Sequence, residues 1–498
     1  MKGIALFFFF AVAIFNSSSA QVIKFSEEIK ENRNAKFMRI LGADENGNVY
    51  VLRSNISLET DRDRVGFKSR VYFLQYLNLD LKLIWELELT TPYENGRIAD
   101  VQLNNGRVVV VSFLNDRKSK AYTFFIQALS DKGSWISSPV EIDKFIANDL
   151  DEDDKPGVIN SQDELSMAFS YRKISVDKKI QIYQVVVIDT SFSIRYKKQI
   201  EIQGSTSMYI PVSFLLSNRS SFFALGVHYT TEKRTKSQSE MYYELHGYNP
   251  VNDQFLHSFI KSESKFLTDV GFSIDNYNKR VIAAGFYSDL TTYSIAGIFY
   301  NSFSEENLTQ ISSQNSAFPA SYFQKFTGER KLERNKELVN YSIDRLIVRR
   351  DGGVAILAES FNRAERSYWD YYMQTYVYHY YYHYGNVMVL SINPSGEILW
   401  ANAVSKDQNS IDDSGYSSSY LSSIVNGKIL SFYNKYIGEE SSVLLTTIDG
   451  IGAQKTDVLF NENERITIIP KSAKQIDEET ILMPAYKQNK FYILKINP

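Results

Sequence analysis

One unit recurs along this chain, and it is most visible from Asp344 to Lys406. The unit begins with an apolar run, an Asp-Gly-Gly turn at 351–353 and a second apolar run, which predicts two antiparallel strands joined by a hairpin. After a tyrosine-rich insertion, the pattern returns as two further strands around an Asn-Pro-Ser-Gly turn at 393–396. Four consecutive antiparallel strands form one blade of a β-propeller. The unit therefore predicts an all-β propeller.

The same unit can be followed over the rest of the sequence. The complete units lie within Phe37–Thr90, Gly96–Phe145, Asp163–Gln203, Ile210–Lys261, Thr268–Ser312, Asp344–Lys406 and the stretch that starts at Tyr420. A last unit, from Arg465, has only three strands before Pro498. Since Val22–Ile29 has the composition of a fourth strand, we expect it to pair with Lys490–Asn497, which would close the ring and remove two exposed sheet edges. The sequence thus predicts a single propeller domain over residues 21–498 with eight four-stranded blades, or seven as the alternative.

Helical periodicity is nearly absent from the sequence. The one predicted helix is Phe326–Leu338, a charged stretch between the fifth and sixth units. We interpret it as a solvated connector.

The first twenty residues have the pattern of a signal peptide. Lys2 is followed by the apolar run Ile4–Phe15 and by the small residues Ser18-Ser19-Ala20. A membrane anchor is the alternative, but a helix needs about 20 apolar residues to span a bilayer. We therefore expect residues 1–20 to be removed, the mature chain to begin at Gln21, and no membrane span to remain.

The cysteine content and the charge of the chain limit the compartments and the kinds of partner that we expect. The chain has no cysteine, which excludes disulfides and thiolate metal sites and favours a bacterial periplasmic or extracellular protein. With 55 basic and 58 acidic residues, it has no strong positive field to attract nucleic acid.

Parts of Gly352–Tyr433 resemble a group of exported, propeller-like proteins of Bacteroidota that are mostly uncharacterised. The similar stretches are GGVAILAESF, YYYHYGNVMVLSINPSGEILWANAVSKDQ and GYSSSYLSSIVNGKILSFYNK. The segment Asn393–Trp400 is also similar to the blade-closing motif of quinoprotein-type propellers. The resemblance implies a fold and export to the cell envelope. It implies no catalytic residue and no cofactor.

The histidines give no clear metal site in the sequence. His379 and His383 have the spacing of two ligands on a helical face, but the three tyrosines between them favour a strand, where they lie about 13 Å apart. The other three, His228, His246 and His257, lie in strand or turn contexts and are predicted to be structural.

The acidic run from Asp149 to Asp154 alternates like a calcium loop but has Asn160 where a bidentate glutamate is needed. No nucleophile elbow or phosphate-binding glycine loop is present. We therefore predict no catalytic residue, no metal and no cofactor.

The tyrosine-rich insertion at 365–385 is the one unusual surface. On a strand its alternate tyrosines share one face, and with three nearby aromatic residues they would form an aromatic ribbon. The predicted binding residues are Trp369, Tyr371, Tyr372, Tyr376, Tyr378, Tyr380, Tyr382 and Tyr384. Two interpretations stay open: additional core packed over a neighbouring blade, or a recognition surface for a sugar or protein.

Three functions follow as hypotheses. A non-catalytic binding or scaffolding propeller of the cell envelope, with a protein or glycan partner, is favoured because nothing marks a reaction. A glycan-binding or glycoside-cleaving propeller is the alternative, and cleavage would need two carboxylates about 5 to 10 Å apart across the central funnel. A quinoprotein-like oxidoreductase is a distant third.

Overall fold

The computed structural model describes residues 22–31, 35–55, 71–116, 118–119, 121–136, 138–146, 157–174, 179–232, 241–260, 262, 265–290, 292–327, 337–438 and 441–498. The predicted signal peptide, the acidic run 149–154 and residues 328–336 of the predicted helix lie outside this part of the chain.

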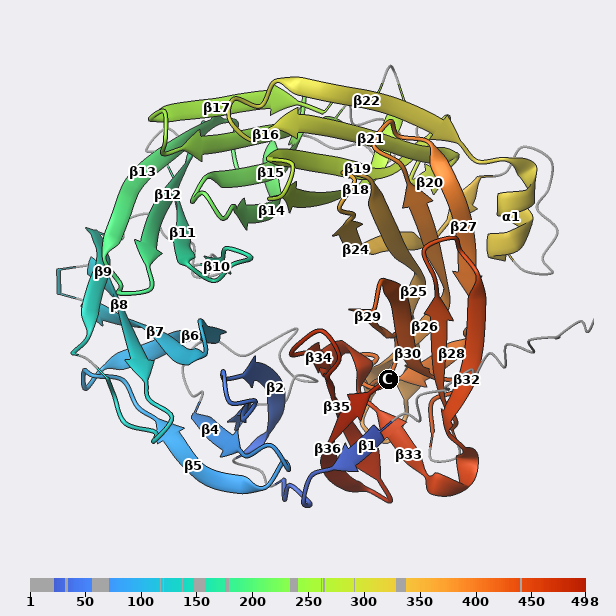
Figure 1. The fold of residues 1–498 in the computed structure, drawn as a ribbon, viewed down its shortest axis with the longest axis horizontal. Coiled ribbons are helices and arrows are strands. Elements are labelled where there is room, and N and C mark those ends of the chain that lie inside the picture. The colour runs from blue at the N-terminus through green and yellow to red at the C-terminus, as the bar shows by residue number, and fades with distance from the viewer. Residues whose placement is uncertain are drawn as a thin grey trace, which may run out of the picture.

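The described residues form an all-β fold of nine antiparallel sheets, eight of which have four or five strands. Figure 1 shows the sheets following one another in chain order around a common centre, with the first strand of most sheets innermost and the fourth outermost. The first four are β2 (Lys36–Ala43), β3 (Val49–Ser54), β4 (Tyr72–Leu77) and β5 (Leu83–Leu89); β6 (Gly96–Asn104), β7 (Arg107–Asp116), β8 (Ala121–Leu129) and β9 (Val140–Ile146); β10 (Gly157–Asn160), β11 (Ser166–Ile174), β12 (Ile180–Asp189) and β13 (Ile194–Gln203); and β14 (Tyr209–Leu216), β15 (Phe222–Tyr229), β16 (Met241–Asn249) and β17 (Gln254–Phe259).

The later sheets keep this four-strand order with small additions. They are β18 (Phe266–Asp275), β19 (Arg280–Ser288), β21 (Gly297–Ser304) and β22 (Gln310–Ala317); β24 (Tyr341–Val348), β25 (Val354–Asp370), β26 (Thr375–Ile392) and β27 (Ile398–Val404), with β28 (Gln408–Ile411) beside β26; β29 (Leu421–Val425), β30 (Lys428–Asn434), β31 (Val443–Ile448) and β32 (Gln454–Phe460); and β33 (Ile466–Ile468), β34 (Lys474–Gln475), β35 (Ile481–Lys487), β36 (Lys490–Asn497) and β1 (Val22–Phe25). The short strands β20 (Ser294–Ile295) and β23 (Leu338–Val339) form the remaining sheet. Each predicted unit therefore corresponds to an antiparallel sheet of four strands, or of five in the sixth and last units, although the third begins earlier than predicted, at Gly157.

The two ends of the described chain meet in one sheet. β1 pairs antiparallel with β36, with Val22 opposite Asn497 and Phe25 opposite Leu494. Beyond the strand, the Ile29 amide still donates to the Phe491 carbonyl at 3.0 Å. The structure has the pairing that the sequence predicts, with a regular strand that ends at Phe25 rather than Ile29.

The core lies between neighbouring sheets, which explains why the middle strands are apolar almost throughout. In β15, Phe222 and Ala224 pack toward the sheet of β10–β13, whereas Phe223 and Leu225 pack toward the sheet of β18–β22. A strand covered on both faces buries every residue and so loses the polar alternation of a half-exposed strand. One core cluster joins the first sheet to the last; it includes Phe37, Val51, Leu482, Phe491 and Ile493.

Side chains of the innermost strands also link successive sheets. Side-chain N–H groups on an inner strand donate to a backbone carbonyl on the inner strand of a neighbouring sheet. These bonds connect the sheets and satisfy carbonyl groups that would otherwise need a water molecule. These bonds are Arg39 to Val101 (2.5 Å), Gln102 to Val158 (3.2 Å), Arg345 to Ser422 (2.8 Å), Gln475 to Ile424 (2.7 Å), and Lys474 of the last sheet to Leu41 of the first.

Two tryptophans at matching positions of the outermost strands make the same contact. Trp85 of β5 donates its indole N–H to the Asp131 carbonyl at 2.8 Å, and Trp400 of β27 donates to the Gly450 carbonyl at 3.1 Å. Each acceptor lies in the outer turn of the following sheet. In the second turn Gly452 has φ +87°, and an added Cβ would lie 2.9 Å from the Trp400 ring, so the contact requires glycine there. The Asn393–Trp400 segment thus has a structural role in this chain.

The predicted helix Phe326–Leu338 overlaps the described helix only at Phe326 and Thr327, and residues 328–336 lie outside the described part of the chain. The helix found is α1 (Ala320–Thr327), and Leu338, the predicted last residue, lies in β23. Helix α1 is held by its aromatic side chains, since Phe326 is buried and Tyr322 and Phe323 pack against the same core cluster. Burial of these rings stabilises the helix, because a helix this short depends on tertiary packing.

Candidate functional site

The tyrosine-rich insertion is a continuation of the two middle strands of its sheet. β25 and β26 have 17 and 18 residues and remain paired from Val354–Ile392 to Asp370–Thr375. Aromatic residues favour extended strands, so the tyrosine run prolongs the hairpin. At its end the Asp370 carboxylate accepts the backbone amides of Tyr372 and Met373 at 2.8 and 3.0 Å, which fixes the turn.

The hairpin divides the eight predicted binding residues into two groups. Their cross-strand register places the even-numbered tyrosines of β26 on one face, as the sequence predicts. Exposure falls along that face, from Tyr376 and Tyr378, which are exposed, through the half-buried Tyr380 to Tyr382 and Tyr384, which are 7% and 3% exposed. At the turn, Tyr371 and Tyr372 are 84% and 100% exposed, and Trp369 is also exposed. The tip fits the recognition interpretation, and the base fits the packing interpretation.

The base of the hairpin is fastened by a third strand and by charged side chains. β28 pairs with β26 from Tyr381–Ile411 to Tyr384–Gln408. The Tyr384 ring packs on Phe361 with centroids 4.7 Å apart, and its hydroxyl accepts a 2.8 Å hydrogen bond from Lys471. A Cβ at Gly415 would lie 2.5 Å from this ring, so glycine is needed for Tyr384 to be buried.

The opposite face of the hairpin carries the two histidines that the sequence spacing singled out. They lie on a strand, as predicted, and each pairs with its own aspartate: His379 with Asp412 at 2.6 Å and His383 with Asp407 at 2.8 Å. Tyr368 stacks on the His379 ring with centroids 5.5 Å apart. This arrangement does not bring the two histidines to a shared centre.

A buried ion pair lies beside the base of the hairpin. Lys406 Nζ lies 2.5 Å from Glu359 Oε1, and the two side chains are 0% and 5% exposed. Ser419 donates a 2.7 Å hydrogen bond to the other Glu359 oxygen. Burial lowers the pKa of Lys406, and the charge of Glu359 opposes that shift.

Asp344 lies next to this ion pair on the innermost strand β24. It is the extra residue at a β-bulge between Ile343 and Arg345, and its side chain is exposed to solvent. Crowding by the surrounding protein, together with the charge of Glu359, raises the pKa of Asp344 to about 7. The Tyr420 hydroxyl donates to its carboxylate at 3.0 Å and partly offsets that shift.

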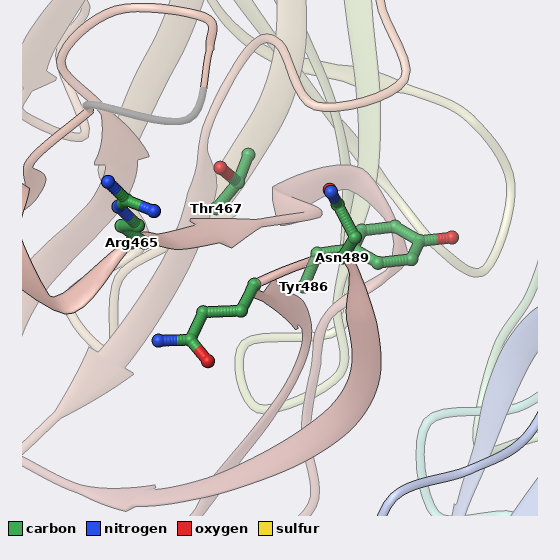
Figure 2. A pocket seen from close by; sticks show the side chains of 5 residues that line it. Arg465, Thr467, Tyr486 and Asn489 are labelled. Atoms are coloured by element: carbon green, nitrogen blue, oxygen red, sulfur yellow. The ribbon is translucent and has the colours of Figure 1, made fainter.

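A small pocket lies at the turn of the last sheet. Figure 2 shows the side chains that line it, which come from β33, β35, the β35–β36 turn and Arg465. Its volume is about 130 Å³, below the ~300 Å³ that is typical of ligand pockets. We therefore assign it no binding role.

A second group of titratable residues lies in the sheet of β14–β17, and sequence reasoning missed it. Glu244, His246 and His257 place one potential ligand atom each within 4.8 Å of one another. A pocket of about 550 Å³ opens beside them between β13 and the outer strands β16 and β17. The signal that was missed is the register of the β16–β17 hairpin. Asn249 and Gln254 face each other at its turn. His246 lies three residues before Asn249 and His257 three residues after Gln254, so the two histidines also face each other.

Comparison with known proteins gives distant structural matches alone. No family model matches the chain, and no curated protein sequence matches it. Similar solved structures include the WD40 domain of SCAP from fission yeast (10% identity, 96% of this chain and 98% of that chain covered, TM-score 0.42) and the polysaccharide lyase Uly1 (8%, 95% and 99%, 0.36). A third is the β-propeller domain of the Trilobed protease from Pyrococcus furiosus (9%, 88% and 98%, 0.35). All three TM-scores are below 0.5, so these similarities carry no argument about this chain. Among the described residues, no helix has the length and apolar character needed to cross a membrane.

Proposed function

We propose that this protein is a non-catalytic binding propeller of the bacterial cell envelope, and that it recognises a protein or glycan partner through the tip of the β25–β26 hairpin. The observation that carries the proposal is the exposure of Tyr371 and Tyr372 at the end of a hairpin whose base is buried. Exposed large aromatic rings gathered in one place are typical of contact surfaces, because each ring offers a flat apolar face and a polar edge. A fastened base reduces the conformational entropy that is lost when a partner binds.

The proposal also includes the ring architecture and export. We propose eight blades, closed by β1 as the fourth strand of the last. The β1–β36 pairing, the core cluster shared by the first and last sheets, and the bond from Lys474 to Leu41 support closure. Residues 1–20 would act as a signal peptide, as the resemblance to exported Bacteroidota proteins implies.

The role of the hairpin tip is tested by comparing substitutions at the tip with substitutions at the base. In the tip variant Tyr372→Ser/Tyr376→Ser/Tyr378→Ser, we expect an unchanged melting temperature and loss of binding to a glycan array or to an envelope protein identified by cross-linking. The base variant Tyr382→Ser/Tyr384→Ser should lower the melting temperature, because it removes two buried rings.

The matched control changes Tyr277 and Tyr293 to serine, since these exposed tyrosines lie outside the hairpin. Binding that survives in the tip variant, or is lost equally in this control, would contradict the proposal.

Closure and export have separate tests. Deleting residues 22–29 exposes the edge of β36, so we expect aggregation or a large fall in melting temperature; an unchanged melt would exclude closure. Protein from the native host should begin at Gln21 and fractionate without detergent. An intact N-terminus in the membrane fraction would show an anchor instead.

Glycoside cleavage is a second candidate because Asp344 is an accessible carboxyl group with a pKa near neutrality. Such a group can donate a proton to a leaving oxygen. Its neighbour Glu359 lies in the same sheet and is occupied by Lys406, so the expected pair of carboxylates facing each other across the funnel is not supplied by these two residues. Release of reducing ends from envelope polysaccharides by the wild type but not by Asp344→Asn would establish this activity.

A further inference from the structure

Three of the chain's five histidines gather on one face of the β14–β17 sheet. His246 lies directly opposite His257 in the β16–β17 hairpin, with ring centroids 4.7 Å apart. Glu244 lies two residues before His246 on the same strand, so its side chain points to the same face. Strand geometry alone therefore places two imidazoles and a carboxylate together.

The distances are close to those of a metal centre. His246 Nε2 lies 2.9 Å from Glu244 Oε2, and all three ligand atoms lie within 4.8 Å of one another. In a tetrahedral zinc site with bonds of about 2.0–2.1 Å, ligand atoms are about 3.3 Å apart. To bring the ligand atoms from within 4.8 Å to this spacing, the His257 side chain would have to move, and it is exposed and can rotate.

A second layer of side chains positions this group. His228 of β15 places Nδ1 3.4 Å from Glu244 Oε1 in an orientation that makes no hydrogen bond, and this nitrogen is buried. The Tyr209 ring closes the inner side, with its centroid 5.8 Å from that of His246. Gly226 makes room for it, since a Cβ there would lie 2.1 Å from the Tyr209 ring. Metal-binding residues are commonly held by such outer partners.

The side chains of Glu244, His246 and His257 are suited to binding one cation together. Three imidazoles face one carboxylate, and in the described part of the chain no lysine or arginine pairs with Glu244. Neutral imidazole nitrogens beside a carboxylate are the donor set that Zn²⁺ prefers.

We propose that Glu244, His246 and His257 bind a divalent cation of the zinc class, with His228 as a positioning residue and a fourth coordination position open to the pocket between β13 and β16–β17. Two histidines, one glutamate and an open position would leave room for water or for a ligand group at the metal. Gln199, Glu201 and Gln203 of β13 line the facing side of that pocket and can contact such a ligand.

The test is zinc titration of the purified chain without a histidine tag, after chelator treatment and dialysis. We expect one Zn²⁺ per chain by calorimetry, with affinity at least roughly 100-fold lower in His257→Gln and roughly 10- to 100-fold lower in His228→Gln. His257 is exposed, so His257→Gln should keep the wild-type melting temperature without metal. X-ray absorption of the loaded chain should show nitrogen and oxygen ligands with an imidazole signature.

The matched control is the double variant His379→Gln/His383→Gln, which removes the other two histidines and should bind zinc as the wild type does. Absence of stoichiometric binding in the folded wild type would overturn the proposal. Equal loss of binding in the control would also overturn it, because the cation would then lie on the hairpin.

Discussion

Among the described strands, β25 and β16 each bury a glutamate, and the two carboxylates have different partners. Glu359 on β25 is paired with Lys406, and both side chains are enclosed. Glu244 on β16 is paired with His246 and faces an open pocket, with His257 exposed at its edge. A lysine is a permanent internal cation as long as its pair is intact, whereas an imidazole can lose its proton near neutral pH and offer a lone pair. The first arrangement is closed to solvent, and the second borders a pocket.

The strongest test of this contrast is Lys406→Met. The substitution leaves the buried Glu359 charge without its partner, so we expect a loss of about 3–5 kcal/mol in the free energy of unfolding. Denaturant unfolding measures the change. Lys455→Met is the control, because its pair with Asp457 is exposed and should contribute less than about 1 kcal/mol. Equal effects of the two variants would mean that Lys406 is not a fixed part of the core.

The glutamates themselves can be compared through matched amide substitutions. Glu359→Gln should destabilise the protein by about 2–4 kcal/mol, because Lys406 is left unpaired in the core. Glu244→Gln should change stability by about 1 kcal/mol at pH 7.5, because no lysine or arginine in the described part of the chain pairs with Glu244 and the amide oxygen still accepts a hydrogen bond from His246. If Glu244→Gln proved as damaging as Glu359→Gln, the two sites would have the same structural role.

A smaller effect is expected from Asp344→Asn, which removes a second acidic group near Lys406. The folded-state pKa of Asp344 is raised from 3.8 to about 7, so between these values the folded protein holds a proton that the unfolded chain has released. Wild-type stability attributable to this group therefore falls as pH rises from about 4 to 7 and is level above that. The variant should melt higher than the wild type at pH 8, with the difference shrinking toward pH 4. A pH-independent difference would show that Asp344 ionises normally.

The smallest effect should come from the hairpin histidines. His379→Gln and His383→Gln each remove one partner of a partly exposed ion pair, which contributes no more than about 0.5 kcal/mol. Thermal melts at pH 6 and pH 8 measure the change. A loss above about 2 kcal/mol in the free energy of unfolding would show that these two histidines stabilise the fold as strongly as buried residues do. The contrast between them and the histidines of the β14–β17 sheet would then be weaker.

Much of the fold was predictable because its signals are local. Apolar runs and turns such as Asn393–Gly396 define strands from a few residues, and the matching positions of Trp85 and Trp400 revealed the repeat. The pairing of β1 with β36 followed from counting strands, since the last unit was one short.

The candidate sites were harder to predict because they depend on long-range placement. Spacing drew attention to His379 and His383, but each found its own aspartate from a distant segment. His246 and His257 are eleven residues apart in the sequence, and only the register of their hairpin brings them together. Likewise, the change from exposed to buried tyrosines along β26 depends on β28, which folds back from beyond β27.

The pairing of β1 with β36 also has a consequence for the order in which the chain folds. Val22 and Asn497 lie almost the whole chain apart, so this contact closes the longest loop of the described structure. Contacts of such sequence separation form late, because the intervening chain must be ordered before they become favourable. The other large sheets are built from neighbouring segments and can assemble while synthesis proceeds. The last sheet, in contrast, is complete only when β1 and β36 have both folded and paired. Until then the edge of β36 is open to pairing with another chain. A chaperone would therefore have its largest effect at this stage.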